Sequence, residues 1–183
     1  FYTFTLTIMK TILVCVTSDL STDNRILRHC ELMHQMGFRV HLIGRILPWS
    51  PPMPALPYPV HRVKLPFLKG PLFYLSYQCW LFFFLLFKKA EIIWANDLDT
   101  VLPCFLVSKL RRHMFVVDSH ELFTEVPELS KAPIKKSIWK FIEKHFAVKA
   151  NIFITVNQSL AGIFHEKYGI NPTVVRNVPK RVE

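Results

Sequence analysis

Short apolar runs alternate with longer segments of helical periodicity along most of the chain. The runs predict strands at 11–16, 39–44, 60–65, 91–97, 114–119, 152–156 and 173–178. Between them the pattern predicts helices over 24–36, 71–87, 100–112, 135–149 and 159–168. Because strands that alternate with helices form right-handed crossovers, we expect an α/β fold, a Rossmann-like, doubly wound parallel sheet of about six or seven strands in a three-layer αβα arrangement.

Residues 48–59 interrupt the alternation, since this stretch holds six prolines. Proline lacks a backbone N–H and fixes φ, so the stretch is expected to be an exposed loop. The polar stretch 17–24 is a second expected loop, between the first strand and the first helix. The strand at 60–65 is expected nearer the edge of the sheet.

The first helix carries start and stop signals at both ends. Ile26, Cys30 and Met33 recur on one face, which predicts the buried side. Asp23 or Thr22 is the expected N-cap. Gly37 is expected to end the helix.

Two later helices give comparable predictions. Over 135–149, Ile138, Ile142 and Phe146 are expected to point inward and the lysines outward. The helix over 159–168 is expected to take Ser159 as its N-cap and to end at Gly169.

The segment 71–87, PLFYLSYQCWLFFFLLF, is apolar on nearly every side and begins with a proline, a favourable first helical residue. A membrane-spanning helix needs about 20 apolar residues, whereas Ser76, Tyr77 and Gln78 interrupt this one. The flanking strands and helices therefore favour a buried or surface-docked helix over a membrane span.

The chain is basic, with a formal net charge of +10 and a sequence pI of about 9.6. This balance suggests an anionic partner, but no arginine-rich arm or aromatic–basic stripe typical of nucleic-acid binding is present. We expect no nucleic acid and instead consider an anionic membrane surface. No secretory signal is evident, and residues 1–9 are expected to be an extension preceding a domain at 10–183.

The cysteines give no metal-type spacing and lie in apolar segments, so they are expected to be buried thiols in a reducing compartment: Cys15, Cys30, Cys79 and Cys104. Together with the missing signal, this predicts a cytoplasmic protein, peripheral at the inner membrane face if the basic surface binds lipid.

Five predicted strands finish in polar residues, at 17–19, 95–97, 118–121, 156–159 and 176–179. One polar strand end is ordinary, because turns and helix caps favour Asp, Asn and Ser. Ligands of doubly wound sheets bind beyond the carboxyl ends of the strands, so five such ends predict a cleft for a polyhydroxy or phosphorylated molecule.

Several chemistries are excluded by the absence of their motifs. The chain has five glycines and no GxGxxG, no GxxxxGK[ST] and no GxSxG sequence. No Cys/His cluster has zinc-ligand spacing. We therefore expect no bound cofactor and no metal.

The segments DNRILRHCELMHQMGFRVHLIG, ANDLDTVLPC, VVDSHELFTEVPEL, TVNQSLAGIF and VVRNVP, in this order, resemble the N-terminal half of GT-B glycosyltransferases of the family-four type. The resemblance spans about residues 10–179. It implies two Rossmann-like domains, of which this chain would be the acceptor-binding one. The second domain, with a Glu-x7-Glu motif beyond residue 183, would bind a nucleotide-diphosphate sugar.

The resemblance also implies roles for the residues after the strand at 114–119. His120 would approach the donor sugar near its reacting carbon. Asp118 or Glu121 would fix the imidazole tautomer or receive an acceptor hydroxyl. The alternative is that Asp118 and Ser119 only cap the following turn and His120 is merely exposed.

Other polar ends are weaker candidates for substrate binding. Asn96 and Asp97 could hold acceptor hydroxyls, although Asp97 could equally cap the next helix. Asn157 is a candidate cleft residue, and Arg25 could reach a phosphate or remain a solvated arginine. Asn177 lies where relatives often read PNG before the interdomain hinge. The other seven histidines are expected to be structural or exposed: His29, His34, His41, His61, His113, His145 and His165.

The expected function is retaining transfer of a sugar from a nucleotide-diphosphate sugar to a polysaccharide or lipid-linked acceptor. Two alternatives stay open at this point. One is a GT-B-like epimerase acting on a nucleotide-sugar, and the other is a non-enzymatic Rossmann-like binding module.

Overall fold

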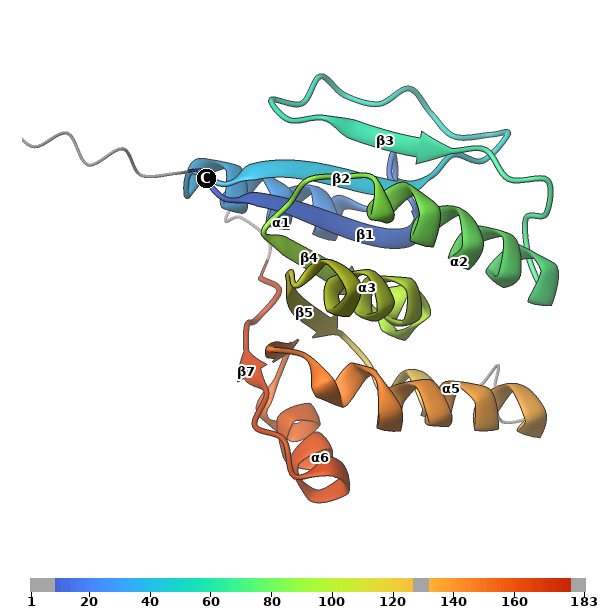
Figure 1. Cartoon of the computed structure of the whole chain (residues 1–183), viewed down its shortest axis with the longest axis vertical. Helices are drawn as coiled ribbons and strands as arrows, with labels where there is room; N and C mark the ends of the chain where they lie inside the picture. The colour runs from blue at the N-terminus through green and yellow to red at the C-terminus, as the bar shows by residue number, and fades with distance from the viewer. Residues whose placement is uncertain (1–8, 127–131, 179–183) are drawn as a thin grey trace, which may run out of the picture.

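The computed structural model describes residues 9–126 and 132–178, and they form one parallel sheet with helices on both faces (Figure 1). The sheet order within these residues is β3-β2-β1-β4-β5-β6-β7. This confirms the predicted α/β class and places β3 at an edge. The strands are β1 Thr11–Asp19, β2 Arg39–Arg45, β3 Val60–Val63, β4 Ile92–Asn96, β5 Met114–Ser119, β6 Ile152–Thr155 and β7 Thr173–Val174.

The helices divide between the two faces of the sheet. Figure 1 shows α2, α3 and α5 side by side on the near face and α1 behind the sheet. The described helices are α1 Asn24–Gln35, α2 Pro71–Leu86, α3 Leu98–Arg111, α5 Pro133–His145 and α6 Gln158–Tyr168. Short 3-10 turns lie at Phe123–Glu125 and Ala147–Lys149.

The strands are apolar on both faces because helices cover both. In β1, Leu13 and Cys15 join the core under α2, α3 and α5, while Ile12, Val14 and Val16 join the core under α1. This two-sided burial explains the continuous apolar runs of the sequence, since alternate side chains of a strand point to opposite faces.

Helix α1 follows its predicted pattern. Ile26, Cys30 and Met33 are buried, and Oδ1 of Asp23 accepts a hydrogen bond from the Ile26 amide at 3.1 Å. Asp23 is therefore the N-cap, which confirms one of the two alternatives predicted from the sequence. Gly37 follows the helix at φ +88°, a backbone conformation that favours glycine, and so ends it.

Helix α2 has 16 residues, and no helix among the described residues is long and apolar enough to cross a bilayer. Phe73, Tyr77, Leu81 and Leu85 form its buried stripe. The helix is therefore docked on the sheet through one face, as predicted.

Several local predictions are wrong. On α5 the buried residues include Trp139 and Ile142, whereas Ile138 is 54% exposed because it lies about 100° around the helix from Trp139. Cys79 is exposed, on the side of α2 away from the sheet. Asn157 rather than Ser159 caps α6, with its Oδ1 accepting from the Leu160 amide at 2.8 Å.

The other wrong predictions concern the ends of strands and helices. Residues 17–19 extend β1 instead of forming a loop, and β7 covers only Thr173–Val174. Helix α5 ends at His145, so Phe146 lies just beyond it and is half-buried. The length of a strand depends on the strands it pairs with, and the local sequence pattern does not show these partners. Here β1 lies between two strands, whereas β7 lies at an edge of the sheet.

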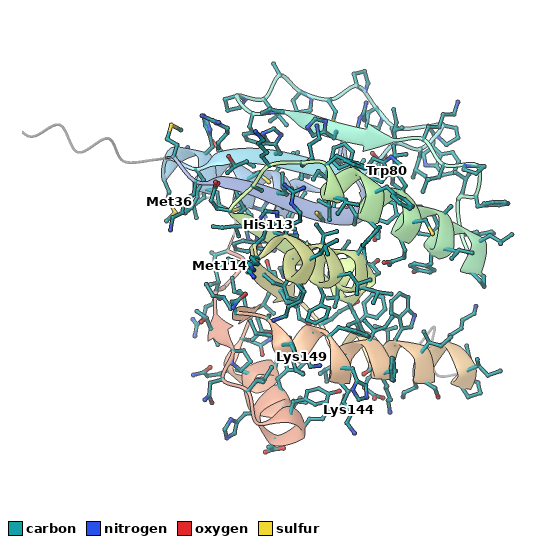
Figure 2. All side chains as sticks on the ribbon, viewed as in Figure 1. Met36, Trp80, His113, Met114, Lys144 and Lys149 are labelled. Carbon is teal, nitrogen blue, oxygen red and sulfur yellow. The ribbon has the colours of Figure 1, made fainter. Side chains whose placement is uncertain are left out.

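An apolar hollow of about 300 Å³ lies on the α1 side of the sheet, between α1 and the strands β4 to β6. Figure 2 shows Met36, at the end of α1, and Met114, at the start of β5, near each other at the edge where strands begin. His29 and Asp118 also line this hollow. His29 and Asp118 lie toward the other edge of the sheet, where the strands end in polar residues.

Candidate functional site

The polar ends of the central strands meet at one edge because the strands are parallel and in register. Asn96 of β4 pairs with Asp118 of β5, and Ser119 pairs with Thr155 of β6. The predicted convergence of these ends therefore holds for β4, β5 and β6.

Asp118 and His120 contact each other at this edge. Nε2 of His120 lies 3.2 Å from Oδ2 of Asp118, and Nδ1 of His29 lies 3.6 Å from the same oxygen. The rings of His29 and His120 are 6.1 Å apart, centroid to centroid. Asp118 thus lies between two imidazoles, one from helix α1 and one from the loop after β5.

The polar atoms of this cluster are buried but incompletely satisfied. Within the described residues, neither ring nitrogen of His120 nor Oδ2 of Asp118 has a hydrogen-bond partner, because the 3.2 Å contact lacks hydrogen-bond angles. An unpaired buried polar atom costs about 1–3 kcal/mol. A group that supplied donors and acceptors here would recover that energy.

His29 is neutral at physiological pH, since burial lowers the pKa of its imidazole and the attraction of Asp118 offsets this only in part. A neutral imidazole carries one N–H and one acceptor nitrogen. His29 can therefore share a proton with Asp118 or accept one from a ligand hydroxyl.

Asp97 connects the cluster to helix α1. Its Oδ1 accepts from the main-chain N–H of His120 at 3.3 Å, and its Oδ2 lies 3.3 Å from Nη2 of Arg25. Asp97 adopts φ +59° and ψ 167°, a conformation that non-glycine residues rarely adopt. Arg25 and Asp97 are about three-quarters buried. The pair therefore fixes the position of the His120 loop.

A second buried carboxyl lies next to this pair. Asp99, in the first turn of α3, accepts a hydrogen bond from the Thr17 hydroxyl, and its carbonyl accepts from the side chain of Gln78. Burial raises the pKa of Asp99 to about 7, the Thr17 hydrogen bond opposes the rise, and nearby Asp97 adds to it. The carboxyl can hold or release a proton near neutral pH.

The remaining predicted residues do not enter the cluster. Asn96 is buried and donates to the Cys15 carbonyl, Glu121 is exposed, and Asn157 caps α6. Asn177 is exposed, and its Oδ1 accepts from Nη2 of Arg28 at 2.9 Å. The alternative of an exposed His120 does not hold, since its side chain is only 9% exposed.

Sequence reasoning missed His29 and Asp99. The sequence pattern predicts a structural or exposed His29, yet His29 follows Arg25 by four residues, a spacing that puts both on one face of a helix. Asp99 lies two residues after Asp97 in a strand-to-helix turn already judged polar. The sequence contains both residues at suggestive positions, but only the pairing of the strands shows that they lie near the other residues of the site.

No group of three or more His, Cys, Asp or Glu side chains among the described residues is arranged to hold a metal ion. A hollow of about 500 Å³ lies between α1 and the loop at 55–58, beside Asn24 and Arg28. Neither His120 nor Asp118 lines it. Asp118 and His29 of the cluster instead line the apolar hollow of about 300 Å³ described above.

Comparison with solved structures gives the same fold. Sucrose-phosphate synthase from Thermosynechococcus elongatus superposes with a TM-score of 0.65 at 14% identity, covering 92% of this chain and 48% of that one. A second structure of the same enzyme gives a TM-score of 0.59 at 11% identity, covering 91% and 84%. The chain thus spans about half of the first structure's length.

No curated protein matches the chain. The sequence pattern of one family does match, over residues 23–180, which include Arg25, His29, Asp97, Asp118 and His120. The chain belongs to Glycosyltransferase Family 4.

Proposed function

We propose that residues 10–183 are the acceptor-side domain of a retaining glycosyltransferase that uses a nucleotide-diphosphate sugar. Membership of Glycosyltransferase Family 4 supports the reaction class. The observation that carries the site assignment is the buried Asp118–His120 contact with three unpaired polar atoms at the edge where the strands end. The retained anomeric configuration, the nucleotide-diphosphate donor and the class of acceptor are proposed from the resemblance of the sequence to the family.

The cluster fits the charges of glycosyl transfer. Positive, oxocarbenium-like charge develops on the transferred sugar, and negative charge develops on the leaving diphosphate. The unpaired ring nitrogens of His120 can hydrogen-bond the sugar hydroxyls, while the carboxylate of Asp118 offers a negative charge nearby. Such preoriented groups lower the barrier by positioning and electrostatics.

Asp97 and Arg25 act as positioning residues in this proposal. The Asp97 carboxylate accepts a hydrogen bond from the main-chain N–H of His120, and Arg25 forms an ion pair with Asp97. The donor would come from a second domain across the edge of the sheet, and no metal or bound cofactor takes part. The acceptor is a carbohydrate or a lipid-linked carbohydrate, which calls for a cytoplasmic enzyme peripheral to an anionic membrane.

The test uses the intact protein that contains this domain. A thermal-stabilisation screen of nucleotide-sugars first identifies the donor, and product analysis then distinguishes transfer from isomerisation. His120→Ala is expected to lower kcat/KM about 100-fold, whereas His165→Ala, at an exposed position on α6, leaves it unchanged.

Two results would overturn the proposal. Activity of His120→Ala within about threefold of wild type, a barrier change of roughly 0.7 kcal/mol, removes His120 from the site. An isomerised nucleotide-sugar as the product replaces the transferase with an epimerase. A product of inverted anomeric configuration overturns the retaining course alone.

A further inference from the structure

The outer surface of the α2–α3–α5 layer is apolar along its length. On α2 and at its end, the exposed residues Leu72, Leu75, Cys79, Phe83 and Phe87 recur every three or four residues, opposite the stripe that packs on the sheet. Phe83 is 59% exposed and Phe87, at the helix end, 79%. A soluble surface rarely carries such a continuous stripe without a partner.

Helix α5 presents a second stripe. Ile134, Ile138 and Phe141 are exposed at i, i+4 and i+7, and Ile134 is 77% exposed. Helix α3 lies between α2 and α5 and adds exposed Leu106 and Leu110 (Figure 1). The three helices together form one broad surface, which we call the basic–apolar face.

The charges on this face are mostly positive. Residues 64–90 contain no Asp or Glu, and the acids within α3 and α5, Asp99 and Glu143, are buried. Exposed cations on or beside the helices are Lys69, Lys89, Lys109, Lys135, Lys140 and Lys144, the last labelled in Figure 2. Among the described residues of these helices, every exposed charged side chain is therefore positive. One acid beside them, Glu125, pairs with Lys136 and Lys140 of α5.

A hollow of about 390 Å³ opens between α2, α3 and α5, lined by Pro71, Tyr74, Leu75, Leu102, Ile138 and Trp139. Lys135 lies at the same hollow. Its lining is largely apolar, with a cation beside it, which suits an acyl chain below an anionic headgroup.

The hollow also lies toward the edge that carries His120. Helices that follow parallel strands start at the edge where those strands end and run back antiparallel. Pro71 and Lys135 lie in the first turns of α2 and α5. A lipid seated here would have its headgroup near the proposed acceptor side.

We propose that the basic–apolar face docks on an anionic lipid bilayer, with the hollow between α2 and α5 taking a lipid acyl chain. Exposed leucine and phenylalanine side chains enter the interface, and the lysines contact lipid phosphates, to which the anionic surface attracts them. A second copy of this chain is a poor occupant, because it would bring another set of positive charges against the first.

The inference rests on the proposed function only for the lipid-linked acceptor, and its test needs no sugar transfer. The chain is mixed with phosphatidylglycerol or phosphatidylcholine vesicles and sedimented at low and high salt. Binding to phosphatidylglycerol is expected to exceed that to phosphatidylcholine at least tenfold, and to fall with salt.

Two variants divide the apolar and charged contributions. Leu75→Ser/Phe83→Ser is expected to lower vesicle affinity at least tenfold, whereas Leu32→Ser/Met36→Ser, exposed on α1 behind the sheet, leaves it unchanged. Lys135→Glu/Lys144→Glu is expected to lower it at least tenfold, whereas Lys10→Glu/Arg39→Glu, at the edge where β1 and β2 begin, has less than a threefold effect.

Circular dichroism confirms that each variant is folded before its binding is counted. Equal loss of affinity in the α1 control and the α2 variant would overturn the docking surface, and so would failure of the wild-type chain to sediment with phosphatidylglycerol. A dimer that the α2 variant dissociates, with no vesicle binding, would assign the face to protein association instead. If the vesicles bind and no transfer is found, only the proposed function fails.

Discussion

Asp97 holds the loop of His120 through a hydrogen bond from the His120 amide at 3.3 Å, and does so from a strained backbone conformation of its own. Strain of this kind costs about 1–3 kcal/mol and persists where the surrounding structure enforces it. Here the enforcing contacts are the Arg25 ion pair and the hydrogen bond from the Asp97 amide to the Asp118 carbonyl.

The strain at Asp97 predicts a separation of stability from activity. Asp97→Gly and Asp97→Ala remove the same carboxylate, but only glycine relieves the positive φ. The glycine variant is therefore expected to be about 1–2 kcal/mol more stable than the alanine variant. Both should lose at least tenfold in transfer. Urea unfolding and initial rates measure the two effects, and equal stability of the variants would refute the strain.

His29 should act through Asp118. His29→Ala is expected to lower transfer about tenfold, because it removes one of the two imidazoles that lie beside the Asp118 carboxylate. His34→Ala, at the far end of the same helix, is the matched control and should keep wild-type activity. A structural role alone would leave the pH profile unchanged, so a shifted acid limb in the variant is the diagnostic reading.

Asp99 makes folding stability depend on pH. Its folded pKa of about 7 exceeds its unfolded value of about 3.8, so the folded state binds the extra proton between these pH values. Stability from this group is complete below about pH 4 and is lost as pH rises to 7, by on the order of 4 kcal/mol. Asp99→Asn should remove this part of the slope in urea unfolding between pH 5 and 7.5. An unchanged slope would contradict the raised pKa.

Glu143 joins α5 to α6. Its buried carboxylate accepts from Nζ of Lys167 at 2.8 Å and from the Tyr168 hydroxyl. Glu143→Gln is expected to cost about 2 kcal/mol of unfolding free energy, a moderate loss because Lys167 is one-third exposed and can return to water. Glu125→Gln, which breaks exposed ion pairs with Lys136 and Lys140, should have little effect. Equal losses in both would argue against the buried network.

The sheet was predictable because its signal is local. Continuous apolar runs and capping residues such as Asp23 and Gly37 are read within a few residues, and they located every strand of the described sheet. The inward face of α5 was not predictable from local sequence, since Ile138 and Trp139 are both apolar. Trp139 is the buried one because it packs on the Phe123 ring and faces the side on which α3 lies.

The site was partly predictable for the same reason. His120 and Asp118 are adjacent in sequence, so their contact needs no tertiary knowledge. Their contact with His29, and that of Arg25 with Asp97, joins segments more than 70 residues apart. Such contacts depend on β1 pairing with β4, which no local pattern specifies.

That pairing has a consequence for biosynthesis. Because the first strand is bordered by β2 on one side and β4 on the other, its second partner leaves the ribosome about 80 residues later. Until then one edge of a largely apolar pair of strands stays open to other chains. A chaperone that binds the nascent polypeptide before β4 emerges would shield it during the interval in which it is most prone to aggregate.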